Sequence, residues 1–178
     1  MPNNNLKTFE TTVNIDVPTI IEEEYLSKVL QKVGKVIAEL SLQENIFEVD
    51  FDRLGPDVYI FNLSIISNDQ MRELNNQYRQ KDKSTDVLSF PIHENLREEQ
   101  QVISAPGAPC LLGDIFICHD IAVKQAKENG IDFETELIEL FIHGVLHLFG
   151  YDHEISKIEA DLMYQLEEKI FNVFKEKL

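Results

Sequence analysis

The sequence predicts an α+β fold, in which a small mixed four-stranded sheet is covered by about five helices. Two observations lead to this fold class. Segments with the length and the β-branched residues of strands are grouped in the earlier part of the chain, and long segments with helical periodicity occupy the later part. The length of 178 residues is enough for a hydrophobic core, and no repeat or low-complexity linker divides the sequence. We therefore expect a single domain over residues 1–178.

The beginning of the chain predicts one strand and one helix. Residues 1–8 are expected to form a loose arm. Residues 9–17 alternate imperfectly between polar and apolar side chains and are rich in Thr, Val and Ile, which is typical of a strand. Residues 20–40 place apolar side chains along one side of a helix, which Gly34 weakens slightly without ending it.

The middle of the chain predicts two more strands and a helix between them. Residues 58–66 form an apolar, β-branched run after a Gly-Pro turn signal, so we expect a second strand there. Ser67 and the two residues after it are N-cap candidates for a helix that runs to about residue 78. Residues 85–92 indicate a third strand, and Pro91 marks either its end or an exposed edge.

The later part of the chain predicts a fourth strand and three helices. Residues 93–110 are polar, with a charged run and two prolines, which indicates a long surface loop. The fourth strand is expected at 111–118. The helices are expected at about 120–129, with Asp120 as N-cap, and at about 133–149 and 156–175.

The charge of the chain excludes one class of function. A formal net charge of −16 argues against nonspecific adhesion to nucleic acid, which depends on phosphate neutralisation by lysine and arginine. Residues 71–85 are an exception, because Arg72, Arg79, Lys81 and Lys83 give this stretch a local excess of positive charge. A local basic surface is therefore compatible with the acidic composition.

The sequence also indicates the compartment. No segment is apolar over the length needed to cross a bilayer, and the polar start of the chain lacks the apolar region of a signal peptide. Cys110 and Cys118 provide neither a disulfide framework nor the spacing of a zinc finger. We therefore expect a soluble, cytoplasmic protein with both thiols reduced.

The residue types that carry chemistry are concentrated at 141–153, which reads Phe-Ile-His-Gly-Val-Leu-His-Leu-Phe-Gly-Tyr-Asp-His. His143 and His147 are four residues apart, so on a helix they project from the same face. Gly150 can end this helix with a positive φ, and the chain can then return His153 to the other two imidazoles. Three neutral imidazoles with a fourth position for water form the ligand set of a catalytic zinc. The sequence therefore predicts a metal site at a helix end.

Alternatives stay open at this site. The histidines could be core residues, although three buried imidazoles without a shared partner would leave several ring nitrogens unsatisfied. Asp152 and Glu154 flank His153 and could compete with it as the third ligand. In zinc proteases with a His-Glu-x-x-His motif, the residue after the first histidine is the general base. Here that residue is Gly144, which disfavours peptide hydrolysis of that type.

Together with three other blocks, this stretch resembles the YbeY family of metal-dependent bacterial endoribonucleases. The family hallmark His-Gly-x-Leu-His-Leu-x-Gly-Tyr-Asp-His matches residues 143–153 at every specified position. The block Thr-Asp-Val-Leu-Ser-Phe-Pro stands at 85–91, Leu-Gly-Asp-Ile stands at 112–115, and Leu-Asn-x-x-Tyr-Arg covers 74–79. The resemblance extends over roughly residues 55–175.

The resemblance implies one zinc ion per chain, held by His143, His147 and His153, and hydrolysis of phosphodiester bonds in RNA. It also implies a role in ribosomal RNA maturation and ribosome quality control, with ribosome-associated proteins as partners. Arg79 matches an active-site residue of the family, and its guanidinium could bind a phosphate and stabilise the charge that grows on it. Without the family, Arg79 could equally be a partner of the helix dipole.

Other polar residues near these motifs have weaker assignments. Asp86 and Asp152 could orient a ligand imidazole by hydrogen bonding. Alternatively, the first could be a strand-entry residue and the second could cap the turn. Arg72, Lys81 and Lys83 are expected to contact the phosphates of the substrate.

Three functions remain possible from the sequence. The first is a zinc-dependent endoribonuclease that acts on single strands, without DNA specificity and without a membrane partner. The second is a ribosome-assembly binding factor whose metal is mainly structural, and the third is a metallohydrolase of peptide or amide substrates. Three protein ligands instead of four favour catalysis. His93 and His119 are expected to be structural, and Glu167 and Glu168 are expected on a solvated helix face.

Overall fold

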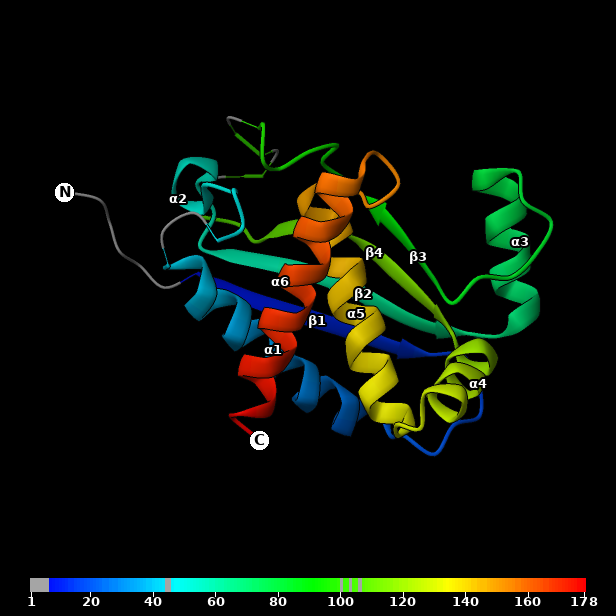
Figure 1. Ribbon diagram of the computed structural model, residues 1–178. Helices are drawn as coiled ribbons and strands as arrows, with labels where there is room; N and C mark the ends of the chain where they lie inside the picture. The colour runs from blue at the N-terminus through cyan, green and yellow to red at the C-terminus, as the bar shows by residue number, and fades with distance from the viewer. Residues whose placement is uncertain (1–6, 44–45, 100, 103, 106) are drawn as a thin grey trace.

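Figure 1 shows the chain as a computed structural model, which describes residues 7–43, 46–99, 101–102, 104–105 and 107–178. Within these residues the elements follow the order β1 (Thr8–Ile15), α1 (Glu23–Ser41), α2 (Phe51–Leu54), β2 (Val58–Ile66), α3 (Asn68–Arg79), β3 (Val87–Pro91), β4 (Cys110–Cys118), α4 (His119–Asn129), α5 (Phe133–Phe149) and α6 (Lys157–Lys175). The predicted α+β class is confirmed. The short α2 comes in addition to the five expected helices, because a single turn is too short to show a period in the sequence.

The four strands form one mixed sheet in the order β1-β2-β4-β3. β1, β2 and β4 are parallel to one another, and β3 pairs with β4 in the antiparallel direction. Pro91 is the last residue of β3, which is an edge strand, as the sequence predicted. One row of paired residues crosses all four strands through Val13, Leu63, Ile115 and Ser89.

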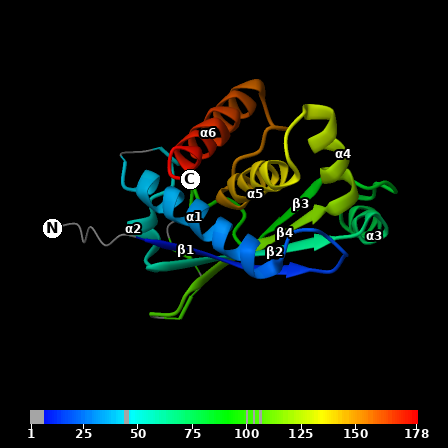
Figure 2. The ribbon, with the colours of Figure 1, turned by 90° about the horizontal axis from the view of Figure 1, so that it is seen from below.

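The helices α1, α5 and α6 form a layer over one face of the sheet (Figure 2). The strand β1 shows how the sequence produces this arrangement. Phe9, Thr11 and Val13 are buried on the helix side, whereas Glu10 and Thr12 alternate with them and are exposed on the other face. None of the described helices is both long enough and apolar enough to cross a membrane.

Residues 7 and 8 do not belong to the loose arm expected at 1–8. Residues 1–6 lie outside the described residues. Lys7 is buried, and its ammonium lies 3.4 Å from a carboxylate oxygen of Asp52 and 3.3 Å from one of Asp57. The strand β1 begins at the next residue. Two carboxylates compensate the buried charge, so the end of the expected arm belongs to the fold.

The helices α1 and α4 begin at residues that differ from the prediction. α1 begins at Glu23, because the residues before it form a turn in which the backbone N–H of Ile21 donates to the hydroxyl of Thr19. α4 begins at His119, so Asp120 lies inside the first turn and is not the N-cap. At that position its carboxylate still interacts favourably with the positive end of the helix.

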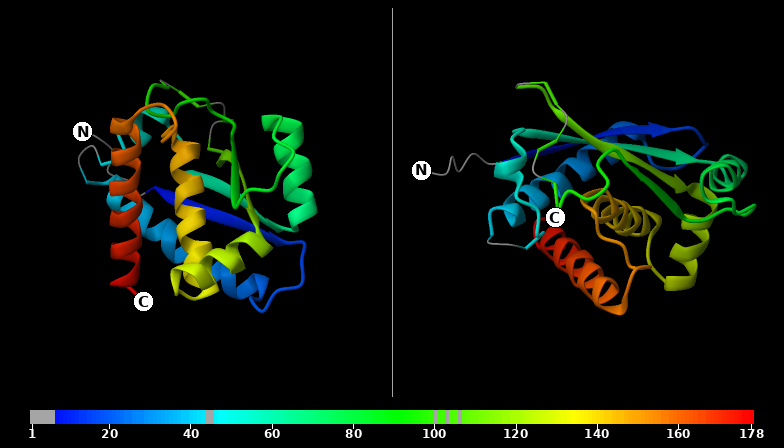
Figure 3. Two further views of the ribbon diagram at one scale, coloured as in Figure 1. Left: turned by 45° about the vertical axis from the view of Figure 1, so that its right-hand side comes forward. Right: turned by 90° about the horizontal axis from the view of Figure 1, so that it is seen from above.

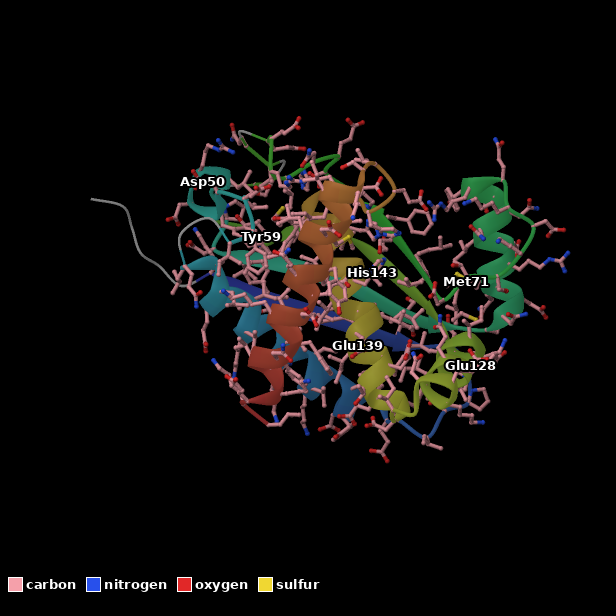
Figure 4. All side chains as sticks on the ribbon, in the orientation of Figure 1. Asp50, Tyr59, Met71, Glu128, Glu139 and His143 are labelled. Carbon is pink, nitrogen blue, oxygen red and sulfur yellow. The ribbon has the colours of Figure 1, made fainter. Side chains whose placement is uncertain are left out.

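The helix α3 lies on the opposite side of β3 from α5 and α6 (Figure 3). Ser67 is its N-cap, as predicted, and forms a capping box with Gln70. Met71 is buried in a small apolar cluster with residues of β2, β3 and β4, and Figure 4 shows it on the sheet side of the helix. Asn75 donates a hydrogen bond of 2.6 Å to the carbonyl oxygen of Lys83. These contacts fix the C-terminal end of α3.

The close approach of α5 to the sheet depends on Gly144. This residue lies over Ile115 of β4 and Ser89 of β3, which are neighbours in the row that crosses the sheet. A Cβ atom at position 144 would lie 2.8 Å from Cγ2 of Ile115 and 3.1 Å from the hydroxyl oxygen of Ser89. Any larger residue would therefore push α5 away from the strands.

We expect Gly144→Ala to lower the free energy of unfolding by about 1–3 kcal/mol, the typical cost of overpacking. Combining it with Ile115→Val removes the methyl group that lies 3.0 Å from the added Cβ, so the double variant should recover part of the loss. Urea denaturation of the single and double variants measures both effects. Equal denaturation midpoints for Gly144→Ala and the unaltered protein would contradict this account of the packing.

Candidate metal centre

The three histidines predicted as metal ligands come together at the end of α5. One ring nitrogen of each lies within 4.8 Å of the others, and the Nε2 atoms of His143 and His147 are 3.1 Å apart. The ring centre of His153 is 5.1 Å from that of each of the other two. Among the described residues, no other group of three or more His, Cys, Asp or Glu side chains brings its ligand atoms this close.

The end of α5 explains why the third histidine returns to the other two. Gly150 follows the helix in the left-handed conformation, with φ at +100°, and its N–H donates to the carbonyl oxygen of His147. This conformation turns the chain and brings His153 beside the helical pair. A side chain at position 150 would also collide with Asn95. Glycine is thus required here both by the backbone conformation and by the available space.

Each helical imidazole is held by a hydrogen bond at Nδ1, on the side away from the shared centre. Nδ1 of His143 lies 2.7 Å from a carboxylate oxygen of Glu167, and Nδ1 of His147 lies 2.9 Å from the carbonyl oxygen of Tyr151. A carbonyl and a carboxylate accept hydrogen bonds, so in the neutral rings that a metal requires both Nδ1 atoms carry the hydrogen and both Nε2 atoms present a lone pair. Two lone pairs facing each other at this distance repel unless a cation binds both. This donor set fits a divalent metal.

The protonation state of the site favours metal binding. Burial, together with the neighbouring His143 and His153, lowers the pKa of His147 to about 4. The ring of His147 is therefore neutral at physiological pH. A neutral imidazole is the form that coordinates a metal.

A cleft of about 750 Å³ opens onto the histidines. Its lining comes from β3 and the residues on either side of it, the C-terminal end of α3, α5, the turn after α5, and one residue of α6. Arg79, the predicted active-site residue, belongs to this lining, and its guanidinium lies 3.2 Å from the carboxylate of Glu154. Both side chains are largely exposed, so solvent screens this ion pair and it can open at little cost.

The wall of the cleft formed by α5 is acidic. Glu139 precedes His143 by one turn (Figure 4), and Glu136 lies on the same side of the helix. Burial raises the pKa of both carboxyl groups, and the charge of Glu136 raises the pKa of Glu139 further. Arg79 is the only lysine or arginine among the described residues of the lining, so it is where an anionic ligand would find a positive charge.

The hydrogen bonds of Asp86 and Asp152 do not support the predicted role of orienting an imidazole. Asp86 accepts hydrogen bonds of 2.9 Å from the side chain of Gln125 and from the backbone N–H of Val87. Asp152 accepts one of 2.8 Å from the backbone N–H of Glu154. Within the described part of the chain, neither carboxylate bonds to a histidine ring. The strand-entry and turn-capping interpretations fit these contacts better.

The three other cations expected to contact the substrate lie outside the cleft lining. The guanidinium of Arg72 donates hydrogen bonds of 2.7 and 2.8 Å to the two carboxylate oxygens of Asp82, so it is already paired. Lys81 and Lys83 are exposed in the segment after α3. These three residues therefore lie apart from the histidines, and Arg79 is the cation of the cleft lining.

Sequence reasoning missed the two groups that hold the helical rings. The pattern of α6 assigned Glu167 to a solvated face, whereas its carboxylate binds His143. Glu167 is four residues after the buried Met163, and this position at the edge of the apolar stripe was the available signal. Tyr151 acts through its backbone carbonyl, which leaves no side-chain signal, and its ring packs 4.5 Å beneath the guanidinium of Arg97.

Comparisons with known proteins identify the family of the chain. The sequence profile of the family described as Endoribonuclease YbeY matches residues 14–175. The chain belongs to this family. A YbeY relative from Sulfurihydrogenibium sp. is 36% identical over 154 residues, which cover 86% of this chain and 89% of the relative. A YbeY relative from Halalkalibacterium halodurans is 40% identical over 124 residues, which cover 70% and 77% of the two chains.

The fold has a counterpart among solved structures. The solution structure of TM1509 from Thermotoga maritima is similar to this chain with a TM-score of 0.52 and 27% sequence identity. The match covers 93% of both chains. The resemblance to the YbeY family that the sequence motifs indicated is thus confirmed.

We expect Glu167→Gln to weaken zinc binding about tenfold and to leave the fold unchanged, because the variant loses the negative charge that polarises His143. Glu168→Gln is the matched control, since Glu168 is the next residue of α6 and bonds to Tyr164 on the surface. Competition with a chromogenic chelator measures the zinc affinity of each variant. The same affinity for both would show that the negative charge of Glu167 does not support the site.

The pKa of His147 predicts how the stability of the metal-free protein depends on pH. In the folded protein this pKa is about 4, below its ordinary value of 6.5. The unfolded chain therefore binds more protons between these values, and the free energy of unfolding must fall as the pH falls from 6.5 towards about 4. His147→Asn should flatten the dependence in that range. Urea denaturation of chelator-treated protein across the range measures it, and parallel pH curves for both proteins would contradict the lowered pKa.

Proposed function

We propose that the protein is a zinc-dependent endoribonuclease that hydrolyses phosphodiester bonds of single-stranded RNA. The observation that carries this proposal is the convergence of three imidazole nitrogens in a cleft that Arg79 also lines. Membership of the YbeY family supports the same activity, because its curated relatives are described as endoribonucleases.

The proposed ligands are His143, His147 and His153, with one zinc ion per chain. When bound, zinc would supply a Lewis acid that activates water and polarises a phosphoryl oxygen. The chain prepares the ligands for this role, since Glu167 and the carbonyl of Tyr151 fix the orientation of the two helical rings. In the described residues the ligand group contains three side chains, which is the number typical of catalytic sites and not of structural ones.

Arg79 would bind the phosphate to be cleaved. Its ion pair with Glu154 supports this assignment, because Glu154 directly follows His153 and the guanidinium therefore reaches the turn that carries the third ligand. A phosphate could replace the Glu154 carboxylate and accept two parallel N–H groups from the guanidinium. The same contact would stabilise the negative charge that develops during cleavage.

Hydrolysis of peptides fits the site less well. A protease of the His-Glu-x-x-His type needs a carboxylate at position 144, where Gly144 lies against Ile115 and leaves no space for a side chain. A ribosome-assembly factor with a purely structural metal would be expected to enclose it with four protein ligands. Gly144 therefore counts against peptide hydrolysis, and the open cleft with three histidines favours an enzyme over an assembly factor.

We further propose that the RNA substrate is ribosomal RNA. In this view the protein acts in the cytoplasm in ribosomal RNA maturation and ribosome quality control, and ribosome-associated proteins are its partners. Support comes from the family motifs at 85–91 and 143–153, which this chain retains. Specificity for DNA is not expected.

Cleavage of a fluorescent single-stranded oligoribonucleotide by the purified, zinc-loaded protein tests the proposal. Arg79→Ala should keep its fold and zinc content and lose about 100-fold or more of the cleavage rate, because a preorganised contact to the developing charge is removed. Arg79→Lys should recover only part of this loss, since an ammonium cannot provide two parallel donors.

Arg72→Ala is the matched control, because Arg72 lies on the same helix and is paired with Asp82 outside the cleft. Two further measurements complete the assay: RNA cleavage by chelator-treated protein, and casein hydrolysis by the unaltered protein. Full RNA cleavage by Arg79→Ala or by chelator-treated protein would overturn the proposal. So would hydrolysis of casein without cleavage of RNA.

A further inference from the structure

Tyr78 is a large aromatic residue that lines the cleft and remains open to solvent. It lies in the last turn of α3, beside Arg79. Its exposed fraction is 59%, whereas the aromatic residues of the main core are almost completely buried. Neither the histidines nor the proposed role of Arg79 accounts for an open aromatic ring at this place.

The ring of Tyr78 is held in position although it is exposed. Its centre lies 5.0 Å from that of Phe90 at an interplanar angle of 68°, and Phe90 in turn contacts Phe116 at 5.6 Å and 81°. The burial of Met71 and Asn75 fixes the helix that carries it. Tyr78 therefore offers a preorganised aromatic surface, and little conformational entropy is lost when a ligand binds to it.

The turn after α5 contributes a second exposed apolar side chain to the cleft lining. Ile155 lines the same cleft as Tyr78 and is 71% exposed. Arg79, which follows Tyr78, forms an ion pair with Glu154, which precedes Ile155. The ion pair thus brings two short segments together at the cleft. Each segment has one apolar and one charged side chain, Tyr78 with Arg79 and Ile155 with Glu154.

The charge of the protein limits how strongly the cleft can attract phosphates. The formal net charge is −16, and Glu136 and Glu139 line the cleft wall on α5. Among the described residues of the lining, Arg79 is the only lysine or arginine. Apart from the proposed metal and Arg79, the described lining therefore offers little electrostatic attraction to the RNA backbone, which leaves room for contacts with the bases to contribute to binding.

Resting on the function proposed above, we propose that Tyr78 stacks on an unpaired nucleobase of the RNA, next to the phosphate that Arg79 binds, and that Ile155 covers the other face of this base. Every base has an aromatic face, so this contact tolerates different sequences. Bases inside a duplex have both faces covered by their neighbours. The stacking contact thus gives a physical reason for selection of single strands.

Substitutions of Tyr78 in the zinc-loaded protein test this inference. Tyr78→Ala should lower kcat/KM for a single-stranded oligoribonucleotide about tenfold, mainly through a higher KM, whereas Tyr78→Phe keeps the ring and should stay within about twofold. Tyr164→Ala is the matched control, because Tyr164 has the same 59% exposure and lies on α6 outside the cleft. Zinc content and thermal unfolding of each variant verify the fold.

A scan with abasic substrates identifies the base in contact. Replacing one nucleotide at a time by an abasic residue should lower cleavage by the unaltered protein at one position near the cleaved bond. Tyr78→Ala should show no further loss with that substrate, because the two changes remove the same contact. A 2-aminopurine at this position should be quenched on mixing with the unaltered protein and not with Tyr78→Ala.

The outcomes separate this inference from the proposed function. Equal kcat/KM for Tyr78→Ala and Tyr164→Ala, with normal RNA cleavage by the unaltered protein, would overturn the stacking inference alone. A loss in Tyr78→Ala that is the same for every abasic substrate would also overturn it, because it would reflect packing. No RNA cleavage by the unaltered zinc-loaded protein would overturn the proposed function instead.

Discussion

The orientation of two imidazole rings is the constraint on which the rest of the site depends. His143 and His147 can share a metal only if their Nε2 lone pairs converge, and a hydrogen bond at Nδ1 fixes each ring in that orientation. One of these bonds requires α6 to bring Glu167 beside α5. The other requires the turn at Gly150, which brings the carbonyl of Tyr151 back to the helix end. Close packing of α5 on the sheet and of α6 on α5 is therefore a condition for the chemistry of the site as well as for stability.

The cleft combines this donor set with an uneven distribution of charge. Glu136 and Glu139 make the α5 wall acidic, while Arg79 lies at the end of α3 on the other side of β3. Asp86, Asp152 and Glu154 also line the cleft, so Arg79 is the place where a phosphate would find a positive charge in an otherwise acidic lining. In a strongly acidic chain a single arginine beside the histidines also keeps nonspecific attraction to RNA low. Contacts such as the one proposed for Tyr78 then become more important for recognition.

Much of the fold follows from local sequence patterns. β2 and α5 occupy the predicted residues, because a continuous β-branched run and a broad apolar helical stripe are both bounded by clear turn signals. Elements with weaker local signals were predicted less well. α2 is a single turn and shows no period, and the start of β1 depends on the buried Lys7 and its ion pairs with Asp52 and Asp57. Those partners are distant in sequence, so the polar residues at the start of the chain indicated an arm.

The sequence by itself determined that His143 and His147 share one face of a helix and that the chain turns at Gly150, because helical spacing and glycine conformation are local properties. Only the tertiary structure decided that Glu167 lies behind His143 and that Glu154 lies opposite Arg79. Periodicity shows which side of α6 is buried, but the rotation and translation of one helix against another decide which of its polar residues meets a given ring. Those quantities depend on the packing of all the surrounding side chains together, and no local stretch of the sequence contains them.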